Sequence, residues 1–232
     1  MALLSLQDAQ LSFGGPPLLD GATLHVEAGE RLALCGRNGA GKTTLLSVLA
    51  GERPLDAGNI IKKPALRVGM LMQEVPDEAD GSVRDVVRSG LTEEGPRAER
   101  AAEAAISRLG LDADVAFAPL SAGNKRKVLL ARAFACEPDL LILDEPTNHL
   151  DIAAIDWLEE RLLRWDGTLV FVSHDRAFMR RLATRVIELE RGVIYSFPGD
   201  YDAFVARKEA TLAAEEKAEH ALDKKLAEEE AW

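Results

Sequence analysis

The sequence lacks long apolar runs and paired cysteines, and these absences exclude several classes of protein. No run approaches the ~18 consecutive apolar residues that a membrane-spanning helix needs, so we expect no part of the chain to cross a bilayer. The first residues, MALLSLQDAQ, lack the charged start and the cleavage site of a signal peptide. The 2 cysteines, Cys35 and Cys136, match no disulfide or metal-binding spacing, which predicts reduced thiols in a cytoplasmic protein.

The chain has fewer basic than acidic residues. The chain has 28 Lys+Arg against 39 Asp+Glu, a formal net charge of −11. This balance disfavours non-specific nucleic-acid binding through the whole surface, although a local basic patch remains possible. A composition of 47% hydrophobic and 29% charged residues excludes a disordered or fibrous chain. A length of 232 residues fits one large α/β domain or two small ones.

Short β-like runs alternate with helical runs, which predicts a parallel sheet flanked by helices. Residues 74–120 are rich in Ala, Glu and Arg and predict a helical subdomain, placed at about residues 74–136, inserted between core strands. The expected strands are residues 3–13, 22–27, 31–35, 140–143, 168–172, 186–189 and 193–195, the last two as a hairpin. The expected helices outside the insertion are residues 42–50, 152–165 and 202–232, the last without a stop signal.

The segment Gly36-Arg37-Asn38-Gly39-Ala40-Gly41-Lys42-Thr43 matches G-x-x-x-x-G-K-[ST] between an expected strand and an expected helix. Glycines let backbone N–H groups curl around phosphates, and the helix N-terminus adds favourable partial charge. Lys42 can reach the β- and γ-phosphates, and the Thr43 hydroxyl suits Mg²⁺. The candidate ATP-binding set also includes Thr44.

Two acids follow the apolar run at residues 140–143. Asp144 and Glu145 lie where that strand ends, the edge at which ligands bind in open α/β sheets. Asp144 is the candidate Mg²⁺ ligand, and Glu145 the candidate base that deprotonates an attacking water. His174 follows the next strand, so we expect it at the same edge, near the γ-phosphate. The other histidines are scattered and predict no metal cluster.

These motifs together resemble the ATP-binding cassette superfamily over essentially the whole chain. The resemblance implies that Phe13 stacks on adenine and that Gln73 contacts Mg²⁺ and the γ-phosphate. It also implies that His174 is the switch histidine and that Asp151 belongs to the loop crossing a dimer interface. The counterpart of the family signature, which acts on the opposite cassette's ATP, is Ser121, Ala122, Gly123 and Asn124.

Within the superfamily, residues 145–151 (EPTNHLD) are similar to the ABC-F class, and the charged C-terminal stretch resembles its Uup branch. This resemblance implies one cassette at residues 1–201 and a truncated linker helix at residues 202–232. The signature departs from L-S-G-G-Q at Ala122 and Asn124. Ala122 adds a methyl group near the partner's phosphate and would be strained if the position needed positive φ.

The resemblance implies an ATP-driven switch in which two cassettes close on two ATP molecules, so a single cassette should hydrolyse ATP weakly. ABC-F similarity implies a ribosomal partner, or else DNA. Residues 124–127 (NKRK), followed by Arg132, form the densest basic cluster, which meets RNA phosphates or is simply a solvated helix face. The same motifs also fit an ATPase subunit of a membrane transporter and a nucleotide-gated module without hydrolysis.

Overall fold

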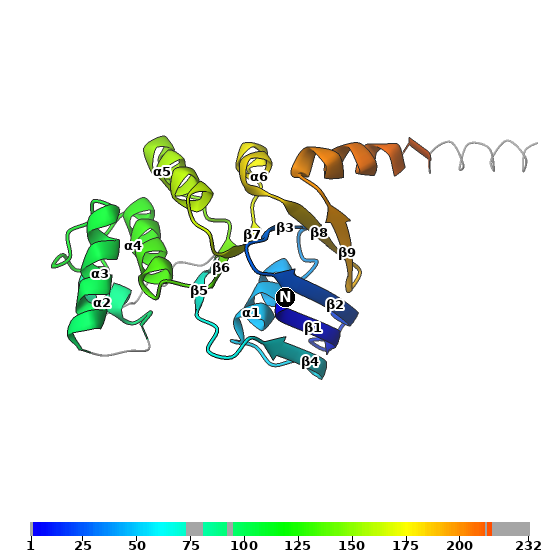
Figure 1. Ribbon diagram of the computed structural model, residues 1–232, viewed down its shortest axis with the longest axis horizontal. Coiled ribbons are helices and arrows are strands. Elements are labelled where there is room, and N and C mark those ends of the chain that lie inside the picture. The colour runs from blue at the N-terminus through cyan, green and yellow to red at the C-terminus, as the bar shows by residue number, and fades with distance from the viewer. Residues whose placement is uncertain (1, 73–80, 92–94, 212, 215–232) are drawn as a thin grey trace, which may run out of the picture.

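The computed structural model describes residues 2–72, 81–91, 95–211 and 213–214 (Figure 1). Three strands near the N-terminus form an antiparallel sheet in the order β2-β1-β4. They are β1 (Ala2–Leu11), β2 (Leu19–Glu27) and β4 (Ala57–Lys62). The expected N-terminal β region is therefore confirmed, although the sequence pattern does not predict β4.

A second sheet of six strands carries the remainder of the fold, in the order β5-β6-β7-β3-β8-β9. Neighbouring strands pair in parallel, except for the antiparallel hairpin of β8 and β9. Their bounds are β3 (Arg31–Cys35), β5 (Val68–Leu71), β6 (Leu140–Asp144), β7 (Thr168–Val172), β8 (Arg185–Glu190) and β9 (Val193–Pro198). β6 and β7 are buried along their whole length, as expected for strands covered on both faces.

Alternate side chains of these strands enter two different hydrophobic clusters. Leu140 and Ile142 face α1 (Lys42–Ala50) and the antiparallel sheet, whereas Leu141 and Leu143 face the helices on the other side. Helix α1 therefore fills the space between the two sheets, and its position is fixed by burial of Leu45, Leu46 and Leu49. This packing holds the start of α1 beside the carboxyl ends of the parallel strands.

Three helices pack against one another beside β5, at the side of the molecule opposite β9 (Figure 1). They are α2 (Val83–Arg88), α3 (Pro96–Arg108) and α4 (Ala122–Ala135). Each presents apolar residues to the same cluster, including Val87, Ile106 and Leu130. The expected insertion is helical in these three segments, while residues 73–80 and 92–94 lie outside the described residues.

Helices α5 (Ile152–Leu163) and α6 (Arg176–Leu182) lie beside each other and contribute to the same face. A further helix covers residues 201–211 and continues at residues 213–214, and it buries Tyr201 and Phe204 in the cluster. The rest of the expected helix at residues 202–232 lies outside the described residues. Across the described ranges, no helix is both long enough and apolar enough to span a bilayer.

Candidate nucleotide site

The phosphate loop joins β3 to α1 and owes its shape to three glycines. Gly36, Gly39 and Gly41 have φ values of 148°, 79° and 97°. Gly41 is the N-cap of α1 and provides no side-chain cap, so the first N–H groups of the helix are available to an anion. The Lys42 ammonium donates to the carbonyls of Gly36 and Arg37, at 2.9 and 3.1 Å. It therefore lies across the loop, where it can meet a phosphate.

Gly36 is the loop position with the least room. A Cβ there would lie 2.6 Å from the carbonyl oxygen of Leu189, and the φ of 148° disfavours a side chain. We expect Gly36→Ala to lower the free energy of unfolding by about 1–3 kcal/mol, measured by urea denaturation. Gly15→Ala is the matched control, because nothing lies within 4 Å of its Cβ position. Equal stability losses in the two variants would contradict the close approach.

A hydroxyl and a carboxylate meet beside the loop. The Thr43 hydroxyl donates to Asp144 Oδ2 at 2.6 Å, joining the first turn of α1 to the end of β6. Oxygen ligands of this kind fit Mg²⁺, which takes few protein ligands and completes its shell with water and phosphate oxygens. Among the described residues there is no group of three or more His, Cys, Asp or Glu that could hold a metal. Thr43 and Asp144 are thus the two candidate Mg²⁺ ligands that the structure brings together.

Glu145 is almost fully buried, with 3% of its surface exposed, directly after β6. Its backbone has a φ of 49°, an uncommon conformation for a residue other than glycine. The backbone N–H of His174 donates to Glu145 Oε2 at 3.1 Å. The His174 ring Nε2 lies 3.4 Å from Glu145 Oε1. The structure thus brings the two residues predicted at this sheet edge into direct contact.

A cavity of about 520 Å³ opens over these residues. Its wall includes Phe13, Lys42, Thr43, Asp144, Glu145 and His174, together with Asn38, Gly39, Gly41 and Thr44. Phe13 is 59% exposed at the rim, and the Arg53 guanidinium lies 4.9 Å from its ring centroid. Gly36 and Arg37 line a neighbouring hollow that Lys42 and His174 share. Leu18 and Asn148 also line the cavity, and neither was among the predicted site residues.

The segment that resembles the signature lies at the start of α4 and does not line this cavity. Ser121 is the N-cap and accepts a hydrogen bond from the Asn124 N–H at 3.3 Å. Ala122 begins the helix and has no positive φ, so its methyl group causes no backbone strain. Gly123 approaches the carbonyl of His149 so closely that a Cβ would lie 2.7 Å from the oxygen. Gln73 lies outside the described residues.

The basic cluster at residues 124–127 is only partly exposed. Arg126 is 1% exposed, because its side chain turns inward beneath β6. Lys127 forms an ion pair with Asp151 at 3.0 Å, and Asp151 also caps α5. The Lys125 ammonium lies 5.5 Å from the Phe117 ring centroid. These charges serve contacts within the chain, and the sequence pattern alone does not reveal that.

Cys35 lies next to the phosphate loop. Burial, reinforced by Glu188 and opposed by Lys42, raises the pKa of its thiol to about 11. Because the thiolate is the reactive form, we expect alkylation by iodoacetamide at pH 8 to be about a hundredfold slower than for an ordinary thiol. The rate should rise about tenfold per pH unit between pH 7 and 9, followed by mass spectrometry of the labelled peptide. Equal rates in the folded chain and in urea would contradict this prediction.

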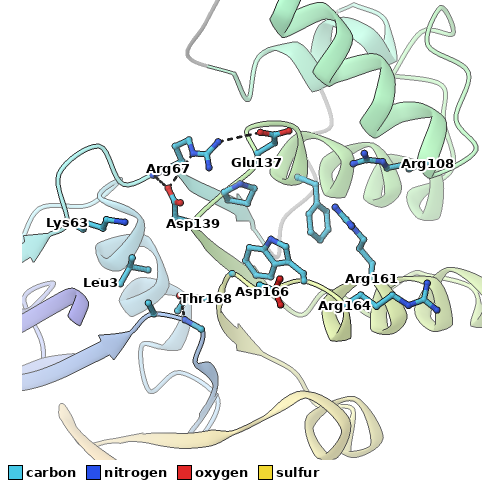
Figure 2. Close-up of a pocket in the computed structure, with 16 residues that line it drawn as sticks. Leu3, Lys63, Arg67, Arg108, Glu137, Asp139, Arg161, Arg164, Asp166 and Thr168 are labelled. Carbon is cyan, nitrogen blue, oxygen red and sulfur yellow. Dashed lines mark hydrogen bonds and ion pairs between the residues drawn. The ribbon is translucent and has the colours of Figure 1, made fainter. Parts of the chain in front are cut away.

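A second cavity, of about 560 Å³, opens at the amino ends of the parallel strands (Figure 2). Arg67 and Asp139 face each other at its edge, joined by an ion pair of 3.3 Å, and Thr168 marks the start of β7. Five Lys or Arg residues and three acidic residues, Glu137, Asp139 and Asp166, line it. Ligands of open α/β sheets bind at the carboxyl ends of the strands. The cavity beside Lys42, at the carboxyl ends of the strands, is therefore the candidate nucleotide site.

The strand–loop–helix, with acids at the end of β6 in the same parallel sheet, defines the P-loop class of nucleotide-binding proteins. A family model described as ABC transporter matches residues 19–148, and a second model with the same description matches residues 187–232. The chain belongs to this family, as one of its ATP-binding cassettes.

Sequence identity to individual proteins shows which branch of the family the chain belongs to. The chain is 41% identical to the ATP-binding protein Uup of Escherichia coli, a match that covers 100% of this chain and 42% of the relative. It is 31% identical to the energy-dependent translational throttle protein EttA of Mycobacterium tuberculosis, over 99% of this chain and 48% of the relative. The chain thus spans less than half of these curated relatives, and it is a cassette of the ABC-F type.

Solved structures show the same fold. One is a dimeric ATP-binding cassette in a post-hydrolysis state, bound to ADP and phosphate. Its TM-score with this chain is 0.73 at 21% identity, covering 84% of this chain and 98% of that one. The α/β architecture expected from the sequence is therefore confirmed.

Proposed function

We propose that this chain binds and hydrolyses ATP as one cassette of a two-cassette protein, and that the resulting opening and closing acts on the translating ribosome. The observation that carries the proposal is the grouping of Lys42, Thr43, Asp144 and Glu145 around one cavity. The site combines a phosphate cradle, oxygen ligands and a buried carboxylate. Its chemistry is phosphoryl transfer to water.

Each residue has a part in that chemistry. Lys42 and the backbone N–H groups of the loop bind the β- and γ-phosphates, and the rim position of Phe13 suits adenine stacking. Thr43 and Asp144, with Gln73 as a further ligand, would hold Mg²⁺, which would supply positive charge to neutralise the phosphates. Glu145 accepts a proton from the attacking water, and His174 holds the γ-phosphate geometry.

The second half of each site comes from another cassette. Ser121, Ala122, Gly123 and Asn124 do not line this chain's own cavity, and their proposed role is to contact the ATP held by a partner cassette. Asp151 lies in the loop beside them. The partner is the second cassette of a longer chain or a second copy of this one. The hydrolysis rate per molecule should therefore rise with protein concentration for this single cassette.

The ribosomal partner rests on the relatives of the ABC-F type, among them the translational throttle protein. A cytoplasmic setting follows from that role. The test is co-sedimentation of a Glu145→Gln variant with ribosomes, in which ATP stays bound because hydrolysis is blocked. We expect pelleting with ATP, none with ADP, and none for Lys42→Ala with either nucleotide.

Three results would overturn the proposed action on the ribosome. Pelleting with ribosomes that does not depend on the nucleotide, or binding to DNA instead of ribosomes, would contradict a translational role. Co-purification with membranes would support a transporter subunit, which relatives at 41% identity do not favour. Phosphate release that depends on Glu145 would exclude a module that binds ATP without hydrolysing it.

A further inference from the structure

Arg126 is a fully buried cation that the nucleotide site does not use directly. It lies in the second turn of α4, one turn beyond Ser121, and only 1% of its surface is exposed. Its guanidinium donates to the carbonyls of Met72, Asp144 and Glu145, the last at 2.7 Å. These carbonyls belong to the chain as it leaves β5 and β6, immediately beneath the nucleotide cavity.

The carbonyl of Glu145 is oriented by an uncommon backbone. With a φ of 49°, this residue turns out of the strand, while its N–H still donates to the carbonyl of Val172. Strained conformations of this kind persist only where the surroundings over-determine them. A buried carbonyl without a donor is destabilising. The Arg126 guanidinium supplies that donor on one side of Glu145, and the His174 N–H holds its carboxylate on the other.

We infer that Arg126 is a positioning residue for Glu145: by holding the Glu145 carbonyl, it fixes the carboxylate against His174 and over the attacking water. The inference rests on the proposed role of Glu145 as the base. Arg126 does not line the nucleotide cavity, so it acts through Glu145 and not on ATP.

The same helix carries the signature segment. Gly123 lies against the carbonyl of His149, and Lys127 pairs with Asp151, so the start of α4 contacts the loop after Glu145 at two further points. An arginine is needed because its planar fork reaches several carbonyls at once, whereas a lysine ammonium presents a single nitrogen.

The first test is a double-mutant cycle in the full chain, with steady-state phosphate release as the readout. We expect Arg126→Lys to lower kcat at least about tenfold with KM within about twofold, because ATP contacts are unchanged. In a Glu145→Gln background the same substitution should cause no further loss, since the group it positions is already absent. Arg132→Lys, also on α4, is the matched control and should retain normal kcat. The inference would be overturned if the double variant lost as much kcat as the product of the two single losses. It would also be overturned if Arg126→Lys changed only KM.

The second test needs no hydrolysis. Amide hydrogen exchange at His174 reports its hydrogen bond to Glu145, and the Ala177 amide, bonded to Asp175, is the internal reference. Arg126→Lys should speed exchange at His174 about tenfold and leave Ala177 unchanged, since one hydrogen bond is worth about that much. Unchanged exchange at His174, or equal acceleration at both amides, would overturn the positioning role. If the wild-type chain released no phosphate, the proposed function would be wrong. The exchange rate at His174 would still test whether Arg126 positions Glu145.

Discussion

Glu145→Gln should lower the rate of phosphate release at least about a hundredfold while ATP affinity stays within about twofold. Glutamine keeps the size of the side chain and an oxygen that accepts from the His174 N–H, so the loop after β6 should keep its shape. It cannot take a proton from water. Phosphate release gives kcat, and a fluorescent ATP analogue gives the dissociation constant.

The control for this prediction is another buried glutamate. Glu159 in α5 is 6% exposed and pairs with Arg181, outside the nucleotide cavity. Glu159→Gln perturbs an ion pair whose carboxylate is buried, so its expected effect is on stability and not on kcat. Wild-type turnover by Glu145→Gln, or an equal loss of kcat in both variants, would contradict the assignment of Glu145 as the base.

Lys42→Ala should weaken ATP binding by about 1.5–3 kcal/mol, or about 10- to 150-fold, because a charged hydrogen bond to phosphate is lost. Its present partners are the carbonyls of Gly36 and Arg37, in a loop with access to solvent. Water can replace the ammonium there. The free energy of unfolding should therefore stay within about 0.5 kcal/mol of the wild type. Isothermal titration with ATP and urea denaturation measure the two quantities separately.

Lys63 supplies the comparison. It lies beyond β4, at the opposite cavity of Figure 2, so Lys63→Ala removes the same charge without touching the phosphate loop. Its ATP affinity should match the wild type. An equal loss for the two lysines would show that general electrostatics, and not the position of Lys42, sets the affinity.

The parts of the fold that depend on neighbours in sequence could be predicted. The helix expected at residues 42–50 is α1 with the same bounds, and Gly51 ends it in a left-handed conformation. The hairpin of β8 and β9 is predictable because Arg191 and Gly192 lie between two apolar runs. In the structure both residues have positive φ. Phosphate loops are recognisable for the same reason: strand, glycines and helix are contiguous.

The unpredicted elements depend on distant partners. β4 alternates poorly, with most of its residues exposed, and is a strand because β1 pairs with it. β5 is only four residues long and is held by parallel pairing with β6. The seven-residue helix α6 is set by its cap, Asp175, which accepts from two N–H groups. No local pattern of apolar residues marks such short segments.

The site shows the same division. The sequence placed Asp144 and Thr43 in one site by motif, but their contact spans 101 residues and exists only in the folded sheet. The sequence pattern groups Arg126 with its basic neighbours, because a run of charges usually faces water. Burial of one charge in that run requires carbonyls from β5 and β6, which helix periodicity does not report.

The strand order carries a consequence for synthesis of the chain. β3, which leads into the phosphate loop, is central in its sheet, yet both of its neighbours, β7 and β8, follow much later in sequence. Its partner residues on β7 are made roughly 140 residues after it, a high contact order that slows folding. The nascent chain must therefore carry an unpaired apolar strand until β7 has been made, and its phosphate loop lacks Asp144 while the intervening residues are added. We expect ATP to stabilise this fold only after β7 has paired with β3.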